Sequence, residues 1–404
     1  MPDAILDKIL TQKHVEEIHS FDPIAVAESL LATLTNRERD IMGRRFGLSP
    51  NTEPVTLEAI GSVLKVTRER VRQVTKGAVE KLRSQHQEHE DTVRFARIAE
   101  QLLRSYGGVL EEHFFISQVV ALADFPATAT IVRQRAALHA EFLFKQVLSD
   151  LIEYRAASER LRSSYFLVGT ERELLLQTAK LFTELVATAG VPLASDDLLV
   201  RFRATNFFKE HQAQLLDEPL RNALELYGVS GMGTLSAQAP SAADLLLSYA
   251  RLTWAIEQNI FGEWGSSNWP TVHPKRMNDK IYLILRQEKK PLHFTAITEK
   301  INAAHFDHKV ARPASVHNEL ILDRRFVLVG RGMYALKEWG FERGTVAEVV
   351  AGVLRRNPGL NREQIVEEVL RRRFVKKQTV YLALMNRLLF SRRHDGGYEI
   401  ASPN

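Results

Sequence analysis

The sequence predicts a mainly α-helical protein, an array of helix-turn-helix and winged-helix units with short β-hairpin wings. Apolar residues recur at spacings of three and four residues through most of the chain, which is typical of one buried helix face. Short alternating runs with glycine-rich turns, at 326–336 and 390–400, follow blocks of helices and predict hairpins. Three helical blocks end in similar strings, SSYFLVG, RRFVLVGRGMYAL and LLFSRRHDGGYEI, so we interpret them as degenerate copies of one unit.

The composition limits the class of protein. The chain has 404 residues, enough for two to four domains, and its net charge of +5 is small for that length. It contains no cysteine, which excludes disulfides, thiolate zinc sites and cysteine nucleophiles. We find no apolar signal-peptide core and no run near the ~18 apolar residues that span a bilayer. We therefore expect a cytoplasmic protein without a membrane partner.

Breaks in the apolar pattern divide the chain into six segments. Residues 85–95 are polar and indicate either a linker or an extension of the preceding helix. The predicted segments are an N-terminal helical segment (1–33), a helix-turn-helix (34–86), two helical segments that resemble degenerate winged helices (96–176, and 177–276 with a Trp/Pro-rich connector), and two winged helices (277–339 and 344–404).

Residues 56–83 predict two helices joined by a tight turn. Thr56 and Thr67 each precede a run with helical periodicity, so we expect both to be N-caps, with the turn at Lys65 and Val66. The inner faces of the two helices would consist of Leu57, Ile60 and Leu64, and of Val71, Val74, Ala78 and Leu82.

The outer face of the second helix carries side chains that can read DNA bases. Arg68, Arg72 and Lys76 form one row, and Glu69 with Gln73 forms the next. Arginine pairs with guanine, glutamine with adenine, and glutamate accepts from cytosine, and a helix-turn-helix brings such a helix into the major groove. Residues 65–83 hold seven basic and two acidic residues, a surplus that attracts phosphates. The pattern alone leaves open an amphipathic hairpin whose charged face is merely solvated.

The string VTRERVRQ at 66–73, preceded by TLEAIG at 56–61 and LTNRERDIMGRRFGL at 34–48, resembles region 4 of the sigma-70 family of bacterial transcription initiation factors. The resemblance covers residues 34–83. It implies that the second helix binds the −35 element of double-stranded promoter DNA and that the domain docks on the β flap of RNA polymerase. Thr75 and Gly77 depart from the family pattern. By position, the implied DNA-binding residues are Thr67, Arg68, Glu69, Arg70, Arg72, Gln73 and Lys76, with Thr67 and Arg70 toward the backbone.

The middle of the chain predicts helices with few distinguishing motifs. No stretch resembles region 2, with which sigma factors melt promoters, so we expect no promoter opening by this chain alone. The expected elements are helices at 96–106, 109–124, 136–154, 171–189, 195–202, 218–227 and 242–261, a short strand at 163–169 and a glycine-rich turn at 228–234.

Residues 277–339 predict three helices and a two-stranded wing that turns at 330–332. The string PLHFTAITEKI, followed by SVHNELILDRRFVLVGRGMYAL, resembles the HARE-HTH winged-helix domain, a family that includes part of the delta subunit of some bacterial RNA polymerases. Residues 344–404 repeat the pattern with a hairpin turn at 395–397. That end holds twelve basic and six acidic residues from 343 onward.

A second basic cluster in the last unit suggests phosphate contact, because the turn before the third helix of such a unit faces the DNA backbone. A solvated run of charge is an equally open interpretation. The secondary DNA-binding candidates are Arg371, Arg372, Arg373, Lys376, Lys377, Arg392 and Arg393.

No catalytic or metal-binding motif accompanies these units. We therefore expect no enzyme, cofactor, metal or small-molecule substrate. The leading hypothesis is a sequence-specific, sigma-like transcription initiation factor or regulator that associates with RNA polymerase. The alternative is a polymerase-binding adaptor that reads no sequence. A third hypothesis is recognition of foreign or modified DNA, because HARE-like domains also occur fused to restriction enzymes.

Overall fold

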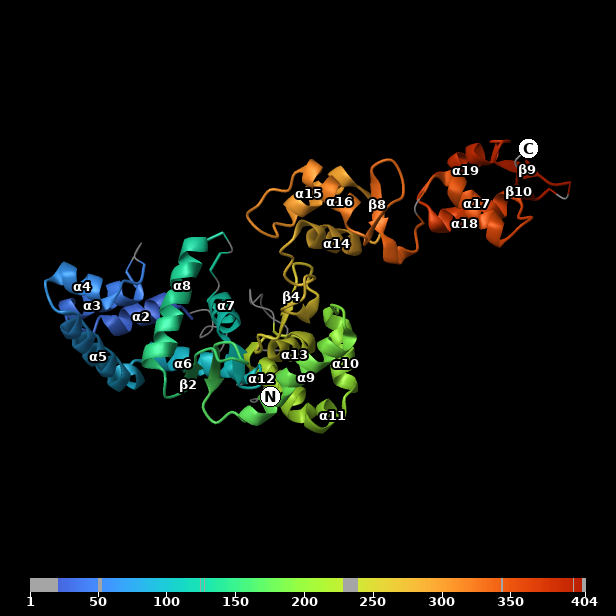
Figure 1. Cartoon of the computed structure of the whole chain (residues 1–404). Coiled ribbons are helices and arrows are strands. Elements are labelled where there is room, and N and C mark those ends of the chain that lie inside the picture. The colour runs from blue at the N-terminus through green and yellow to red at the C-terminus, as the bar shows by residue number, and fades with distance from the viewer. Residues whose placement is uncertain are drawn as a thin grey trace. The chain divides into compact units, whose positions relative to one another are not determined.

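A computed structural model describes residues 21–49, 53–123, 125–126, 128–227, 239–342, 344–394 and 396–401 (Figure 1). The chain divides into two compact units, and the boundary falls between Glu257 and Gln258. The helix expected within the first twenty residues and the glycine-rich turn at 228–234 lie outside the described residues. In the part of the chain that is described, no helix is long and apolar enough to cross a membrane.

The described part of the first unit begins with four helices whose ends follow from local sequence. Asp22 accepts from the backbone N–H of Ile24, and Pro23 occupies the first helical position, which favours a helix start there. Thr35 and Glu38 form a capping box, and Gly47 ends the same helix in the left-handed conformation. The helices are α2 (Pro23–Leu31), α3 (Asn36–Phe46), α4 (Leu57–Leu64) and α5 (Arg68–Gln85).

A three-helix block with a small sheet follows. Residues 85–95 extend the helical path, because η1 (His86–Glu88) leads directly into α6. The strand expected at 163–169 is confirmed as β3, the centre of an antiparallel sheet in the order β1-β3-β2. The elements are α6 (Glu90–Arg104), β1 (Val109–Glu111), α7 (Glu112–Leu122), α8 (Thr130–Phe142), η2 (Leu143–Val147), β2 (Ile152–Arg155) and β3 (Ser164–Leu167).

Two helices expected in this block were predicted too long. Gly107 and Gly108, both in the left-handed conformation, turn the chain so that residues 109–111 pair with β3, and the helix expected from 109 begins at Glu112. The helix expected over 136–154 begins earlier and gives way to a π turn, after which Ile152 pairs with Leu167. In both places cross-strand pairing overrides an ambiguous short apolar run.

The remaining described residues of the first unit form helices and, at its end, a strand. Gly190 ends α9 as expected. The helix expected over 242–261 stops at Ala250, and residues from Ile256 form a strand, so that prediction was wrong in its second half. The elements are α9 (Arg172–Ala189), α10 (Ser195–Ala204), α11 (Asn206–Gln212), η3 (Ala213–Asp217), α12 (Glu218–Tyr227), α13 (Ala242–Ala250) and β4 (Ile256–Gln258), in which the boundary between the units falls.

The second unit contains two successive groups of three helices with antiparallel strands. In the first group the expected helices and hairpin are present, and β6 joins the hairpin to give the order β6-β8-β7. In the second, the Asn361 side chain caps the second helix of the group. The elements are β5 (Trp264–Ser266), α14 (Met277–Glu288), β6 (Leu292–His293), α15 (Phe294–Ala303), α16 (Pro313–Leu322), β7 (Phe326–Leu328), β8 (Met333–Leu336), η4 (Lys337–Trp339), α17 (Val346–Arg356), α18 (Arg362–Arg372), α19 (Lys377–Leu384), β9 (Phe390–Arg392) and β10 (Tyr398–Ile400).

Candidate nucleic-acid interface

The α4–α5 pair has the geometry of a helix-turn-helix. The Thr56 hydroxyl accepts from Ala59 N–H at 3.3 Å, and the Thr67 hydroxyl accepts from Arg70 N–H at 3.2 Å, so both predicted caps are present. Lys65 occupies the turn in the left-handed conformation with φ 54°. A methyl group on Gly61 would lie 2.7 Å from the carbonyl oxygen of Val66, so only glycine lets α4 approach the turn this closely.

A compact apolar core lies beneath the pair. Ile41 from α3, Ile60 from α4 and Val71 from α5 are buried against one another. Val55, Leu57, Leu64, Val66 and Val74 are partly buried around them. Because this core holds the inner edge of α5, the helix keeps a fixed rotation and presents its other side outward.

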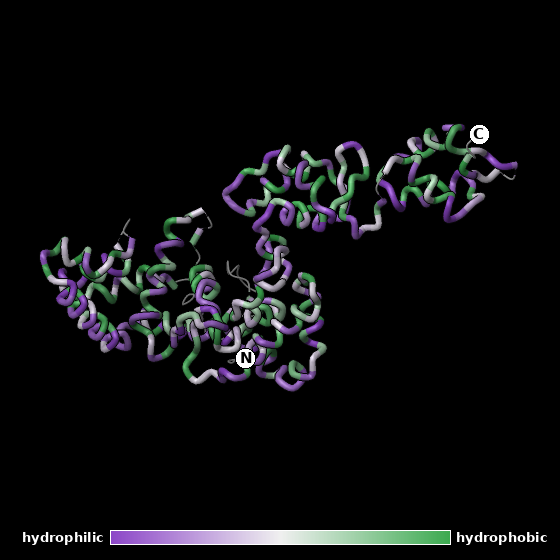
Figure 2. The backbone as a smooth tube through the Cα atoms, in the orientation of Figure 1, coloured by the Kyte–Doolittle hydropathy of each residue, from purple (hydrophilic) through white to green (hydrophobic). Residues whose placement is uncertain are grey.

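The outward side of α5 is polar and exposed. Every DNA-binding residue predicted on or beside this helix, Thr67, Arg68, Glu69, Arg70, Arg72, Gln73 and Lys76, is exposed. Figure 2 shows hydrophilic residues along the ribbon that Figure 1 labels α5. Arg68 forms no hydrogen bond or ion pair with any residue that the structure describes, so its guanidinium is available to a ligand.

Glu69 organises its neighbours on this face. Its carboxylate accepts from Arg72 Nε at 2.8 Å and Arg72 Nη2 at 2.7 Å, a bidentate pair. Gln73 lies at 3.5 Å from the same carboxylate and from Arg70 Nη1. The hydrogen bond from Arg72 lowers the pKa of Glu69, and the same bond raises the pKa of Arg72. The sequence led us to predict these groups as separate base readers, but the three-residue spacing of Glu69 and Arg72 also signals this pairing.

Comparison with known proteins identifies this part of the chain. Residues 30–84 match the family described as sigma-70, region 4. These residues form a sigma-70 region 4 domain. The RNA polymerase sigma factor RpoD of Helicobacter pylori (strain ATCC 700392 / 26695) is 43% identical over 82 residues, which are 20% of this chain and 12% of that protein. The chloroplastic RNA polymerase sigma factor sigD of Arabidopsis thaliana is 49% identical over 59 residues, 15% of this chain and 14% of that protein.

A third relative is the RNA polymerase sigma-C factor of Nostoc sp. (strain PCC 7120 / SAG 25.82 / UTEX 2576), which is 50% identical over 56 residues, 14% of this chain and 13% of that protein. The chain therefore matches only about an eighth of the length of these curated relatives. No solved structure matches it significantly.

The region 4 domain is joined to the helices that follow it. One apolar core includes Leu30 and Leu34 near α2, Leu82 of α5, and Ala140 and Phe142 of α8, all buried. The Phe142 ring lies 5.2 Å from the Phe46 ring, and Arg135 pairs with Glu28 at 3.4 Å. Arg83 Nε donates to the carbonyl oxygen of Gln146 at 2.6 Å. The domain is therefore fixed to α8 and η2 rather than tethered by a linker.

The first turn of α3 in the region 4 domain is anchored to the end of α2 and to α5. Arg39 donates to the carbonyl oxygens of Leu31, Ala32 and Leu34, at 3.1, 2.9 and 3.2 Å. Glu38, which completes the capping box, also pairs with Lys81 of α5, and this bond lowers the pKa of the carboxyl. The Glu38–Lys81 pair fixes α5 against α3, and Arg39 fixes α3 against the end of α2 and the turn that follows it; the predicted DNA-binding set contained none of these three residues.

The structure places the secondary candidates in different environments. Arg371 and Arg372 are ion-paired to Glu367 and Glu368 on their own helix. Arg373 is buried and donates Nη1 to the carbonyl oxygens of Leu328 and Glu342 at 3.0 and 3.1 Å, and burial lowers its pKa. Lys376, Lys377, Arg392 and Arg393 are exposed. Arg371 is exposed as well, and Arg393 lies 3.7 Å from Glu399, so within this cluster Lys376, Lys377 and Arg392 are the exposed cations without an ion-pair partner among the described residues.

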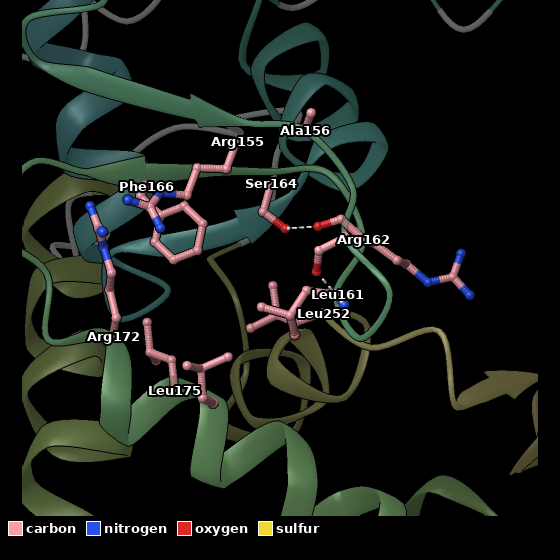
Figure 3. Close-up of a pocket in the computed structure, with 11 residues that line it drawn as sticks. Arg155, Ala156, Leu161, Arg162, Ser164, Phe166, Arg172, Leu175 and Leu252 are labelled. Carbon is pink, nitrogen blue, oxygen red and sulfur yellow. Dashed lines mark hydrogen bonds between the residues drawn. The ribbon is translucent and has the colours of Figure 1, made fainter.

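A cavity of about 160 Å³ in the first unit offers no catalytic constellation (Figure 3). Four leucines and Phe166 line it together with three arginines, and the Arg155 and Arg172 side chains share the carboxylate of Glu153. The hydroxyl of Ser164 donates to the carbonyl oxygen of Arg162, whose own guanidinium points away from the cavity. Among the described residues no group of three His, Cys, Asp or Glu side chains could hold a metal ion.

Proposed function

We propose that this protein is a DNA-binding transcription factor of the sigma-like type, which recognises −35-type promoter DNA through α5 and associates with RNA polymerase. One observation carries the proposal: a region 4 domain whose polar helix face is exposed over a packed core. The base-reading residues would be Arg68, Glu69, Arg72 and Gln73, with Thr67, Arg70 and Lys76 toward the phosphates. Neither an enzymatic activity nor a cofactor is part of the proposal.

The polymerase contact would use surface that the rest of the chain leaves open. The family resemblance implies docking on the β flap, and α8 covers part of the region 4 domain, because Phe142 of α8 packs on Phe46 of α3 at one shared apolar core. Val63 on the outer side of α4 is 62% exposed. A polymerase partner would therefore approach through α4 and the exposed part of α3 rather than through the face that α8 occupies. A cytoplasmic location follows from these proposed partners.

The second unit would supply further contacts. Residues 277–339 contain three helices and an antiparallel sheet, an arrangement that supports the proposed winged helix of HARE-HTH type. The group at 344–401 supports a second, C-terminal winged helix in the same way. The exposed Lys376, Lys377, Arg392 and Arg393 are the remaining candidates for a second phosphate contact.

Footprinting of a −35-type promoter with polymerase core tests the proposal. Arg68→Ala should lose protection upstream, because it removes a cation that no described residue neutralises by an ion pair. Lys180→Ala is a matched control, since this exposed cation on α9 is paired with Glu184 and lies outside the region 4 domain. Unchanged upstream protection in Arg68→Ala would contradict base reading by α5.

One observation favours the alternative of a polymerase-binding adaptor that reads no sequence. Glu69 occupies the donors of Arg72 and contacts Gln73, so two of the proposed base readers are already engaged. Charge reversal of Arg68 and Arg72 separates the two functions. Capture of polymerase core that survives the reversal, together with no shift of promoter DNA by the wild-type protein, would favour the adaptor.

A further inference from the structure

The third helix of residues 344–401, which we call the C-terminal group, exposes apolar side chains. Three side chains are largely exposed: Leu382 of α19 (68%), its C-cap residue Met385 (73%) and Leu388 in the turn that follows (88%). Leu382 and Met385 are three residues apart and share one side of the helix. Leu389 is also exposed. We name these four residues the α19 surface; single exposed apolar residues are ordinary, but a group of them marks an interaction site.

The fold does not need these side chains. The core of the C-terminal group is already filled by residues from the other side of α19, Val380 and Leu384, packed with Val350, Ile365 and Val369. Phe390 of β9 closes the same core. The exposed residues therefore contribute nothing to that core, and their apolar character needs another explanation.

The surroundings of the α19 surface are strongly basic. Residues 374–393 contain five basic residues and no acidic residue. Lys377, Arg387 and Arg392 are exposed, and none of them forms an ion pair with any residue for which the structure gives a position. The Arg362 guanidinium lies 3.7 Å from the centre of the Tyr381 ring, which places another cation against α19. The apolar group thus has a positive rim.

We propose that the α19 surface binds an amphipathic helix of a partner protein, with leucine- or phenylalanine-type side chains along one stripe and Asp or Glu beside them. An exposed apolar group can accept the apolar stripe of an amphipathic helix, and the positive rim selects an acidic flank. This proposal does not depend on DNA reading by α5.

Duplex DNA fits the same surface poorly. Base edges are read by polar donors and acceptors, which Leu382 and Met385 at the end of α19 lack; the exposed polar residues Lys377, Gln378 and Thr379 lie at its start. Phosphates attract the rim cations but gain nothing from the exposed leucines. The geometry therefore favours a protein ligand, and DNA becomes an outcome that the experiment can detect.

A synthetic helix tests the proposal with the full chain. The probe is a fluorescent peptide of about 18 residues, long enough to populate a helix, with leucines at i, i+4, i+7 and i+11 and flanking glutamates. Anisotropy titrations would use the wild type and the double variant Leu382→Gln/Met385→Gln. Leu322→Gln is the matched control, since Leu322 is 75% exposed at the end of α16.

We expect the glutamate-flanked peptide to bind the wild type and the control alike, and the double variant to bind at least about tenfold more weakly. The same peptide with lysine flanks should bind at least about tenfold more weakly than the glutamate-flanked one, and added salt should weaken the acidic complex. Circular dichroism should show the double variant folded, because both side chains are at the surface.

Three results would overturn the proposal. The first is no binding of the glutamate-flanked peptide by the wild type, or equal binding by the double variant. The second is loss of duplex DNA binding, instead of peptide binding, in the double variant. The third is a wild-type dimer in sedimentation that the double variant abolishes, which would show that a second copy of the chain occupies the surface.

Discussion

The region 4 domain and the C-terminal group both present a third helix on a small apolar core, but the two helices expose opposite chemistry. α5 follows its cap Thr67 and α19 follows its cap Lys376, so positions can be compared by counting from these caps. At the fifth, sixth and ninth residues after the cap, α5 has Arg72, Gln73 and Lys76, and α19 has Tyr381, Leu382 and Met385. A similar scaffold therefore carries a polar face in one unit and an apolar face in the other, and the face decides the ligand.

The largest effect expected from this contrast is on DNA affinity. Arg68→Ala/Arg72→Ala should weaken binding of promoter DNA by about a hundredfold at fixed salt, because a bidentate arginine–base contact is worth about 1–3 kcal/mol. Anisotropy titrations at several salt concentrations would measure it. Leu382→Gln/Met385→Gln is the control from the other unit and should leave the DNA affinity unchanged. A comparable loss of DNA affinity in both double variants would contradict the proposed contrast between α5 and α19.

The second prediction concerns the basic cluster of the C-terminal group. Arg373→Ala should lower the free energy of unfolding of that group by about 1.5–3 kcal/mol, because it removes a buried charged donor from two carbonyl oxygens. Arg371→Ala, which removes an exposed ion pair, should cost about 1 kcal/mol or less. Urea unfolding would compare the two variants. Equal stabilities would show that Arg373 does not have the structural role its burial indicates.

The third prediction tests the turn that positions α5. Gly61→Ala should destabilise the region 4 domain by about 1–3 kcal/mol, because the added methyl group meets a backbone oxygen. Gly77→Ala is the matched substitution within α5, where a methyl group meets nothing within 4 Å, and it should raise stability by up to ~1 kcal/mol. Thermal unfolding should therefore shift in opposite directions. Shifts of the same sign would contradict the packing described for α4 and α5.

The smallest effect expected is a pH dependence of the contact between α8 and the region 4 domain. His139 of α8 is buried, and burial lowers the pKa of its imidazole. The unfolded chain therefore binds this proton more readily than the native chain, so stability is present above the ordinary value of about 6.5 and is lost as the pH falls below it. Unfolding midpoints at pH 7.5 and 5.5 should differ more in the wild type than in His139→Leu. If the unfolding midpoint shifts equally with pH in the wild type and in His139→Leu, His139 is not the source of the pH dependence.

Local sequence was sufficient for much of the candidate site. Thr56 and Thr67 were predicted as caps, and the turn was placed at Lys65, because capping and periodicity depend on neighbours a few residues away. The exposed face of α5 followed from the same periodicity. The three helices of each group in the second unit were predicted for the same reason.

Features that depend on distant contacts could not be predicted in this way. Residues 109–111 and 152–155 form strands only because β3 pairs with both. Arg373 lies in a run of three arginines, and nothing in that run distinguishes the buried one, whose acceptors are 45 and 31 residues away. The packing of α8 on α2 likewise joins segments about a hundred residues apart, as the Arg135–Glu28 pair shows.

The most direct test of base reading by α5 is selection of bound duplexes from a random DNA pool, with the wild-type protein and with Arg68→Ala and Arg72→Ala. We predict that the wild type enriches one motif and that each variant loses the preference for a base pair within it while the rest of the motif persists. No enriched motif with the wild type, or the same unaltered motif with both variants, would contradict the assignment of α5 as the helix that reads DNA.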